Sequence, residues 1–204
     1  MKYFNFIFSL ILMTVICTPA TSWAQSYDDD IYVIDKTAPI PENETKKEHK
    51  ERIKKDHDIV DSIYHLKAEL AAQDGYFVLQ ATEVRNSYGQ YEMGLDDSTN
   101  FLLMQGDKGI FQVAFNNMSA GANGLGGITL HGRISKKQVK QDKKGNTIIT
   151  YSMIGRDMNA SVTITIFKES DQAVADVFPT LGNGYITLRG RLVPYLNEDI
   201  RIEP

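Results

Sequence analysis

Apolar and polar residues alternate along much of the chain after residue 75. The pattern is clearest in Ser161–Phe167, where valine and isoleucine alternate with serine and threonine. A period of two places one face of a β-strand against a core and the other face in water. The alternation recurs upstream and downstream, and residues 101–104 are instead a short, fully apolar strand. The further predicted strands are residues 76–84, 101–104, 110–115, 128–134, 147–154 and 184–194. Residues 147–154 are apolar on both faces, which predicts cover on both sides.

Short turn sequences separate the predicted strands. They contain the glycine, asparagine and aspartate that positive φ angles favour, at residues 142–146, 156–159, 169–171 and 182–184. Short connections make consecutive strands pair antiparallel. We therefore predict a curved antiparallel sheet or barrel of about eight strands, and the sequence leaves open whether the sheet closes.

A helical pattern replaces the alternation over residues 43–74, and Gly75 is well placed to end the helix. The first half is densely charged, with acids four residues before bases, and is expected to extend into solvent or toward a partner. The second half carries Ile59, Ile63, Leu66 and Leu70 at positions i, i+4, i+7 and i+11. This stripe predicts that the second half packs on the sheet. The fold class is therefore α+β, mainly β.

The first 24 residues are typical of a secretory signal peptide. Lys2 precedes an apolar run that ends at Cys17, and a small-residue site follows at Ser22–Ala24. Cleavage after Ala24 would remove the chain's one cysteine. The alternatives are an uncleaved membrane anchor and a lipoprotein acylated on Cys17, although Ile16 is larger than the residue that lipid attachment requires.

The predicted organisation after the signal peptide has four parts. A linker spans residues 25–42, the helix 43–74, the β domain 75–194 and a C-terminal tail 195–204. The linker contains the acidic triplet Asp28–Asp30 and an apolar patch, Ile31–Ile34, which either adds an edge strand to the sheet or packs under the helix. After cleavage we expect no membrane span.

Charge and size narrow the classes of function. The whole chain carries a formal charge of −4, and removing the signal peptide takes away Lys2 and no acid, which leaves −5. This mild acidity argues against a nucleic-acid binder, which would present a basic face. About 180 mature residues suffice for one domain with its own core, and we expect a monomer.

The sequence contains no complete catalytic or cofactor-binding motif. The glycine-rich segment 121–127 leads into a strand, whereas phosphate-binding loops lead into a helix. No serine lies in a Gly-x-Ser-x-Gly elbow. His57, Asp61 and His65 share a helix face with metal-ligand spacing, but a wet helix face explains them better. Asp96, Asp97 and Asp107 lack calcium-loop spacing. We expect no cofactor and no metal.

Basic, aromatic and glycine residues of the predicted sheet form the candidate binding surface. Arg133, Arg189 and Arg191 share the polar parity of their strands and could bind an anion, although exposed strand arginines commonly serve solubility. His131 has no obvious carboxylate partner in the sequence, and a structural or surface role is expected rather than that of a general base. The candidate ligand-binding residues are Tyr88, Tyr91, Gly124, Gly126, Gly127, His131, Arg133, Arg189 and Arg191.

The order of these features resembles one known family. The charged helix precedes Tyr76–Ala81, Asn100–Leu102, the glycine-rich Gly124–Ile128, the Lys143–Asn146 hairpin and the closing Thr187–Val193 strand. This order resembles the domain-of-unknown-function family 4251 of bacterial envelope proteins, over about Lys47 to Val193. The resemblance implies antiparallel β-structure after a helix. It implies no established activity, cofactor or catalytic residue.

The sequence is consistent with three functions. The leading hypothesis is a secreted, periplasmic, non-catalytic module that binds a protein, a peptide or a small envelope ligand. The first alternative is an envelope scaffold that docks through its charged helix. The second is a hydrolase whose site assembles only in three dimensions.

Overall fold

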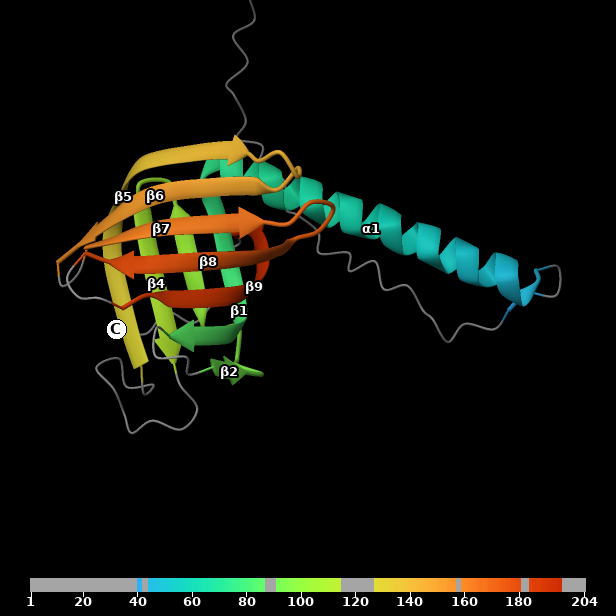
Figure 1. Ribbon diagram of the computed structural model, residues 1–204, viewed down its shortest axis with the longest axis horizontal. Coiled ribbons are helices and arrows are strands. Elements are labelled where there is room, and N and C mark those ends of the chain that lie inside the picture. Colours follow the sequence, from blue (N-terminus) through green and yellow to red (C-terminus); the bar gives the residue numbers. More distant parts are fainter. Residues whose placement is uncertain are drawn as a thin grey trace, which may run out of the picture. The chain divides into compact units, whose positions relative to one another are not determined.

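The structure is a computed structural model that describes residues 40–41, 44–86, 91–114, 127–156, 159–180 and 184–195, with the backbone alone for Asn86 and residues 91–93. These residues form one α-helix followed by nine β-strands (Figure 1). The predicted signal peptide, the Ile31–Ile34 patch and the tail beyond Tyr195 lie outside the described residues. No helix in the described ranges is both long enough and apolar enough to cross a membrane.

The helix α1 spans Lys46–Asp74 and is well defined at both ends. At its start, the Thr45 hydroxyl accepts from the Glu48 amide while the Glu48 carboxylate accepts from the Thr45 amide. This capping box satisfies amides that would otherwise have no partner in the first turn. At its end, Gly75 adopts φ 80° and donates its amide to Ala71. Glycine is favoured there because other side chains resist the left-handed conformation.

The nine strands form one antiparallel sheet in the order β2-β1-β3-β4-β5-β6-β7-β8-β9. Their bounds are β1 Tyr76–Asn86, β2 Tyr91–Met93, β3 Phe101–Gln105, β4 Lys108–Ala114, β5 Gly127–Gln141, β6 Thr147–Gly155, β7 Asn159–Ile166, β8 Gln172–Pro179 and β9 Ile186–Pro194.

The sheet closes on itself because β1 also pairs with β9, from Phe77 opposite Pro194 to Asn86 opposite Ile186. Eight strands therefore form a closed barrel, and the short β2 pairs outside the ring along β1. The prediction of about eight antiparallel strands is confirmed, and the question of closure is answered. Closure leaves the strands of the ring without free edges.

Two close contacts between strand backbones explain particular glycines. A Cβ at Gly127 would collide with the Val113 carbonyl on β4, and one at Gly190 would collide with the Gln80 carbonyl on β1. These two glycines therefore lie where neighbouring backbones approach too closely for a side chain.

The barrel interior is filled by side chains that alternate along the strands. The bulkiest fully buried members of this cluster come from β1, β3, β4, β6, β7 and β9; they are Phe77, Leu79, Leu102, Met104, Phe111, Ile149, Met153, Ile164, Ile166, Leu188 and Leu192. A smaller cluster of Val78, Phe101 and Leu103 lies on the outer side of β1 and β3. The fully apolar strand β3 is thus buried on both faces, as continuous apolar strands usually are.

The prediction for residues 147–154 is only half right. Ile149, Tyr151 and Met153 are buried, but Ile148 is only partly covered and Ile154 is 53% exposed. The structure covers β6 on its inner face alone, because the ring leaves the other face toward solvent. Apolar residues on that face are tolerated singly and do not require a second layer.

The helix covers one end of the barrel with a face of small residues. Ala68, Ala71 and Ala72 are buried and belong to the same core cluster as the barrel interior. At 3.6 residues per turn they share one face of α1. Small side chains let the helix backbone approach the strands closely, so this face is the one that packs.

The apolar stripe predicted to pack on the sheet faces the other way, and that prediction is wrong. On the helical wheel its centre lies about 180° from the alanine face. We call these four residues the outward stripe: Ile59, Ile63, Leu66 and Leu70, which are 49%, 38%, 56% and 44% exposed. The larger side chains would hold the helix too far from the barrel, so the alanine face takes the contact instead.

Candidate functional site

Five predicted site residues flank or lie in parts of the chain that the structure does not describe in full. Tyr88, Gly124 and Gly126 fall outside the described residues. Tyr91 begins β2, where its backbone pairs with Arg85. Gly127 begins β5 opposite Ala114. The strand ends that border these segments lie at the end of the barrel away from α1.

Arg191 is held by two groups from different parts of the fold. Its Nε donates to Asp171 Oδ2 at 2.7 Å, and its Nη2 lies 2.7 Å from the same oxygen. Its guanidinium also lies 5.2 Å from the centre of the Tyr64 ring on α1. Asp171 is buried in the turn between β7 and β8. Arg191 therefore links β9 to this turn and to the helix, and these contacts stabilise the fold.

Arg189 is more loosely held. Its Nη1 lies 3.8 Å from Glu83 Oε2 on β1, and its side chain is 58% exposed. An exposed pair at this distance contributes little to stability. Arg189 therefore remains accessible on the outer face of β9, beside a carboxylate.

The structure does not bring Arg133 and His131 to the two arginines of β9. Both residues are exposed on β5, where His131 pairs with Ile110 and Arg133 lies between Lys108 and Ile154. In the closed ring β5 is four strands from β9 in either direction. The predicted residues thus belong to opposite walls of the barrel and do not form one patch.

The interior of the barrel holds a buried hydroxyl that is unsuited to acid–base chemistry. Tyr151 is 4% exposed, and its hydroxyl has no hydrogen-bond partner in the part of the chain that the structure describes. Burial raises the pKa of Tyr151, which keeps the phenol neutral. Large apolar side chains surround it, so it packs as part of the core.

Hydrogen bonds from three places on the barrel hold the second half of α1. His65 Nδ1 lies 2.8 Å from the Ser170 carbonyl, and the Thr147 hydroxyl donates to the Glu69 carboxylate. Lys137 Nζ donates to the Gln73 carbonyl at 2.7 Å. A bulge in β5, where Lys136 has φ 56°, redirects the strand at this point. A cation at the last turn of a helix is favourable because carbonyls there lack partners.

His65 therefore binds a backbone carbonyl, which accounts for it without a metal. Within the described ranges no group of three or more His, Cys, Asp or Glu side chains could hold a metal ion. The three side chains do not line one wet helix face as expected, because His57 and His65 are partly buried while Asp61 is exposed. The prediction that no metal binds there stays a prediction.

The first half of α1 is held by charges on neighbouring turns. Arg52 Nε donates to Glu44 Oε1 at 2.9 Å, and His49 Nδ1 lies 2.9 Å from Glu44 Oε2. Hydrogen bonds from Arg52 and His49 lower the pKa of Glu44 to about 2. The Thr45 amide likewise lowers the pKa of Glu48. All of these partners lie between residues 44 and 52, so this half of the helix depends on local contacts.

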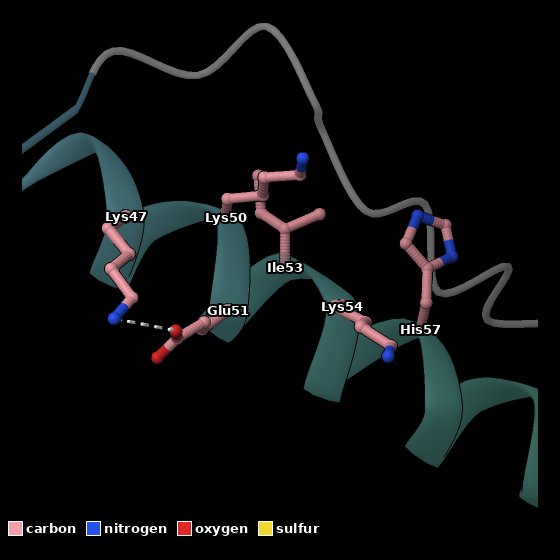
Figure 2. Close-up of a pocket in the computed structure, with 6 residues that line it drawn as sticks. All are labelled: Lys47, Lys50, Glu51, Ile53, Lys54 and His57. Atoms are coloured by element: carbon pink, nitrogen blue, oxygen red, sulfur yellow. Dashed lines mark ion pairs between the residues drawn. The ribbon is translucent and has the colours of Figure 1, made fainter.

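A shallow groove follows the same half of the helix. Figure 2 shows its lining residues along α1, with the Lys47–Glu51 ion pair of 3.8 Å at one end. Ile53 is the one aliphatic residue among the described side chains that line it, which are Lys47, Lys50, Glu51, Ile53, Lys54 and His57. Three of the six described lining residues are lysines, and aliphatic lysine stems with their charged ends in water are typical of a solvated helix face.

The sequence did not predict the orientation of the outward stripe. The signal for the opposite face was present, because Ala68, Ala71 and Ala72 are spaced i, i+3 and i+4. Alanine at this spacing permits close packing as well as solvent exposure, so the sequence alone does not choose between them.

Together these features define a closed antiparallel β-barrel whose end is covered by the second half of a long helix. The sequence model for the domain of unknown function DUF4251 matches residues 64–192. The chain belongs to the DUF4251 family. The match begins at Tyr64, the residue whose ring contacts Arg191, and not at Lys47 as the resemblance suggested.

A solved structure supports the family assignment. It is the crystal structure of a DUF4251 family protein from Bacteroides eggerthii DSM 20697 at 1.95 Å resolution. The two proteins share 31% sequence identity with a TM-score of 0.58, over 67% of this chain and 91% of that chain. A comparison with curated proteins found no match.

Proposed function

We propose that this protein is an exported, non-catalytic interaction module of the bacterial envelope that docks a protein partner through its helix. The observation that carries the proposal is the outward stripe, four exposed apolar side chains on one continuous face of α1. A helix that packs on its own domain normally turns its largest apolar residues inward. Here the domain is stabilised through alanines, and the larger residues are available to a partner.

The packing of the barrel favours the helix over the barrel as the docking element. Phe77, Phe111 and Met153 are among the side chains that fill the interior. Ligand-binding barrels need an interior wide enough to hold a molecule, and these side chains occupy that space. Arg191, which could otherwise bind an anion, is engaged with Asp171 and Tyr64.

The spacing of the stripe indicates the chemistry of the partner. Positions i, i+4, i+7 and i+11 follow the seam that an amphipathic helix buries against another helix or in an apolar groove. The expected partner surface is therefore a protein helix or groove with apolar residues at its centre. Charged residues beside the stripe would form the polar rim of such an interface.

The proposed location and oligomeric state have separate support. The apolar run before Ser22–Ala24 supports export and signal removal, and the mature chain would then be periplasmic or secreted. Barrel closure supports a monomer, because the ring offers no free strand edge for pairing between copies.

The test begins with photocrosslinking in the native host. A benzophenone amino acid replaces Leu66 on the outward stripe in one strain and Ser161, an exposed residue of β7, in the other. We expect a specific partner with Leu66 and none with Ser161. The partner identified by mass spectrometry is then purified for binding measurements.

Binding constants decide whether the stripe is the docking surface. In the triple variant Ile59→Ser, Ile63→Ser, Leu66→Ser, affinity should fall by about tenfold or more, because apolar anchors dominate such interfaces. The matched control is His131→Ala with Arg189→Ala, which changes the barrel surface and should bind normally. The proposal is wrong if the control variant loses the partner while the stripe variant keeps it.

A further inference from the structure

Three neighbouring strands form a part of the barrel wall that is almost free of charge. Neither β6 nor β7 contains an acidic or basic residue, although such residues make up 24% of the whole chain. On β8 the single charged residue is Asp176. The three strands pair in sequence and lie side by side in the barrel (Figure 1). Soluble proteins normally intersperse both signs of charge over their surfaces, so this part of the wall is distinctive.

Hydroxyl groups cover the centre of this wall. They alternate with the buried residues of β6 and β7 and therefore point outward; they belong to Thr150, Ser152, Ser161, Thr163 and Thr165. The register places Thr150 opposite Thr163 and Ser152 opposite Ser161. Among the residues that the structure describes, no protein group is hydrogen-bonded to these five hydroxyls, so they are available to a ligand. We call the outer side of β6, β7 and β8 the hydroxyl face.

An aromatic pair lies at one end of the hydroxyl face. Phe178 on β8 is 46% exposed, and its ring centre lies 5.8 Å from that of Tyr185, with the planes tilted by 33°. Phe178 is directly opposite Ser161 on β7. An exposed aromatic ring offers a flat apolar platform whose face carries partial negative charge.

The single carboxylate of the hydroxyl face lies beside this platform. Asp176 precedes Phe178 by two residues and is directly opposite Thr163, and its Oδ1 accepts from the Thr187 hydroxyl at 2.6 Å. The Cβ atoms of opposite residues in antiparallel strands are about 5 Å apart, and those of diagonal neighbours about 7–8 Å. One small ligand can therefore reach the ring, the carboxylate and the hydroxyls of Ser161 and Thr163 together.

We propose that the hydroxyl face binds a neutral glycan, with one sugar ring stacked on Phe178 and its hydroxyl groups bonded to Asp176, Ser161 and Thr163. A sugar ring has a face of C–H groups, which an aromatic face attracts, and it carries hydroxyl groups around its edge. Carboxylates accept hydrogen bonds from such hydroxyls, and serine and threonine both donate and accept them. The inference goes beyond docking through the helix, because it concerns the barrel wall.

The charges of the hydroxyl face disfavour an anionic ligand. Phosphates and nucleic acids are bound mainly through arginine and lysine, which β6, β7 and β8 lack. The cations of the flanking strands, which include Arg133 on β5 and Arg189 on β9, lie at its margins, and Arg189 lies beside Glu83.

The distribution of apolar residues disfavours a protein ligand. The centre of a protein–protein interface is apolar, depleted in serine and surrounded by a polar rim. The hydroxyl face has the opposite arrangement, because its large exposed apolar residues, Ile154 and Phe178, lie toward one end while hydroxyls occupy the centre. A ligand rich in hydroxyl groups fits this centre better.

Affinity electrophoresis of the chain that begins at Gln25 tests the proposal. Native gels contain one of four neutral polysaccharides, glucomannan, xyloglucan, galactomannan or dextran, or the anionic polygalacturonate. We expect at least one neutral polysaccharide to retard the protein and polygalacturonate to leave its migration unchanged. The dependence of migration on polysaccharide concentration then gives a dissociation constant.

Two variants and a matched control locate the binding site. Phe178→Ala should weaken binding about tenfold through loss of the stacking platform. Thr163→Val removes one hydroxyl while keeping a residue that favours strands, and it should weaken binding about threefold. Phe167→Ala makes the same change as the first variant at a phenylalanine that is 37% exposed directly after β7, and it should bind normally.

Several results would overturn the inference. These are the absence of retardation by all four neutral polysaccharides, equal retardation by polygalacturonate, and equal affinities of the Phe178→Ala and Phe167→Ala variants. A protein crosslinked through the benzophenone at Ser161 would also overturn it, because a protein would then cover the hydroxyl face. Docking through the outward stripe is tested separately by the crosslink at Leu66, so either proposal can fail while the other stands.

Discussion

The two halves of α1 are built by different means. Residues 64–74 are held by the barrel, through the alanine face and the contacts of Tyr64, His65 and Glu69. Residues 46–63 are held by their own capping box and by charge pairs between neighbouring turns. The family match begins at Tyr64, so it covers the first of these regions and leaves out the second.

This difference distinguishes the part of the helix that the fold requires, residues 64–74, from the part that it does not require, residues 46–63. A helix needs tertiary packing because propensity alone stabilises it only marginally in water. Only about the last three turns receive such packing from the barrel. The remaining turns extend beyond the contact with the barrel, and they carry Ile59 and Ile63, the first two residues of the outward stripe that we propose as a docking surface. Three changes test this comparison.

The largest effect is expected at the alanine face. Ala68→Leu should lower the free energy of unfolding by about 3 kcal/mol, the upper part of the range for overpacking, because Ala68 is fully buried between the helix and the barrel. The matched change on the opposite face, Leu66→Ala, should alter it by about 0.5 kcal/mol or less. Urea unfolding measures both. Similar losses in the two variants would contradict the assignment of the two faces.

A smaller effect is expected at the arginines of β9. Arg191→Met leaves the buried Asp171 carboxylate without its cation and should cost about 1–2 kcal/mol. Arg189→Met removes an exposed pair with Glu83 and should cost about 0.5 kcal/mol or less. Thermal unfolding of the two variants gives the comparison. If Arg189 proves the more important residue, the role of Arg191 as a link between helix and barrel is refuted.

The smallest effect is expected from acid in the first half of the helix. The pKa of Glu44 is lowered to about 2 from an ordinary 4.5, and that of Glu48 is also lowered. A lowered carboxyl pKa stabilises the folded state above the ordinary value, and this contribution is lost as the pH falls toward the lowered one. Helical circular dichroism should therefore decrease slightly between about pH 5 and about pH 2.5.

The control for this acid effect is Glu44→Gln, which should start with a less helical first half and lose less on acidification. The barrel should keep its near-ultraviolet signal over the range, because its core is apolar. A loss of barrel signal before the helical change would show that acid acts elsewhere.

Much of the fold follows from the sequence because local patterns set it. The period of two in residues 161–167 predicted β7, and the turn at residues 142–146 is found between β5 and β6, with Asp142 accepting from the Lys144 and Asn146 amides. Gly75 ends the helix as expected. The candidate site was less predictable, because Arg133 and Arg191 share a strand parity but not a wall of the barrel.

The sequence by itself determined the helix, seven of the strands and the antiparallel pairing of consecutive strands, because these depend on side-chain periodicity and on turn residues close together in the chain. The strands β2 and β8 were not among those predicted. Only the tertiary structure decided the closure of the ring, the pairing of Arg191 with Asp171 and the orientation of α1. These depend on residues distant in sequence and on how closely two backbones approach. A stripe of large apolar residues and a stripe of alanines both predict a packed face, and the fit against the barrel selected the smaller one.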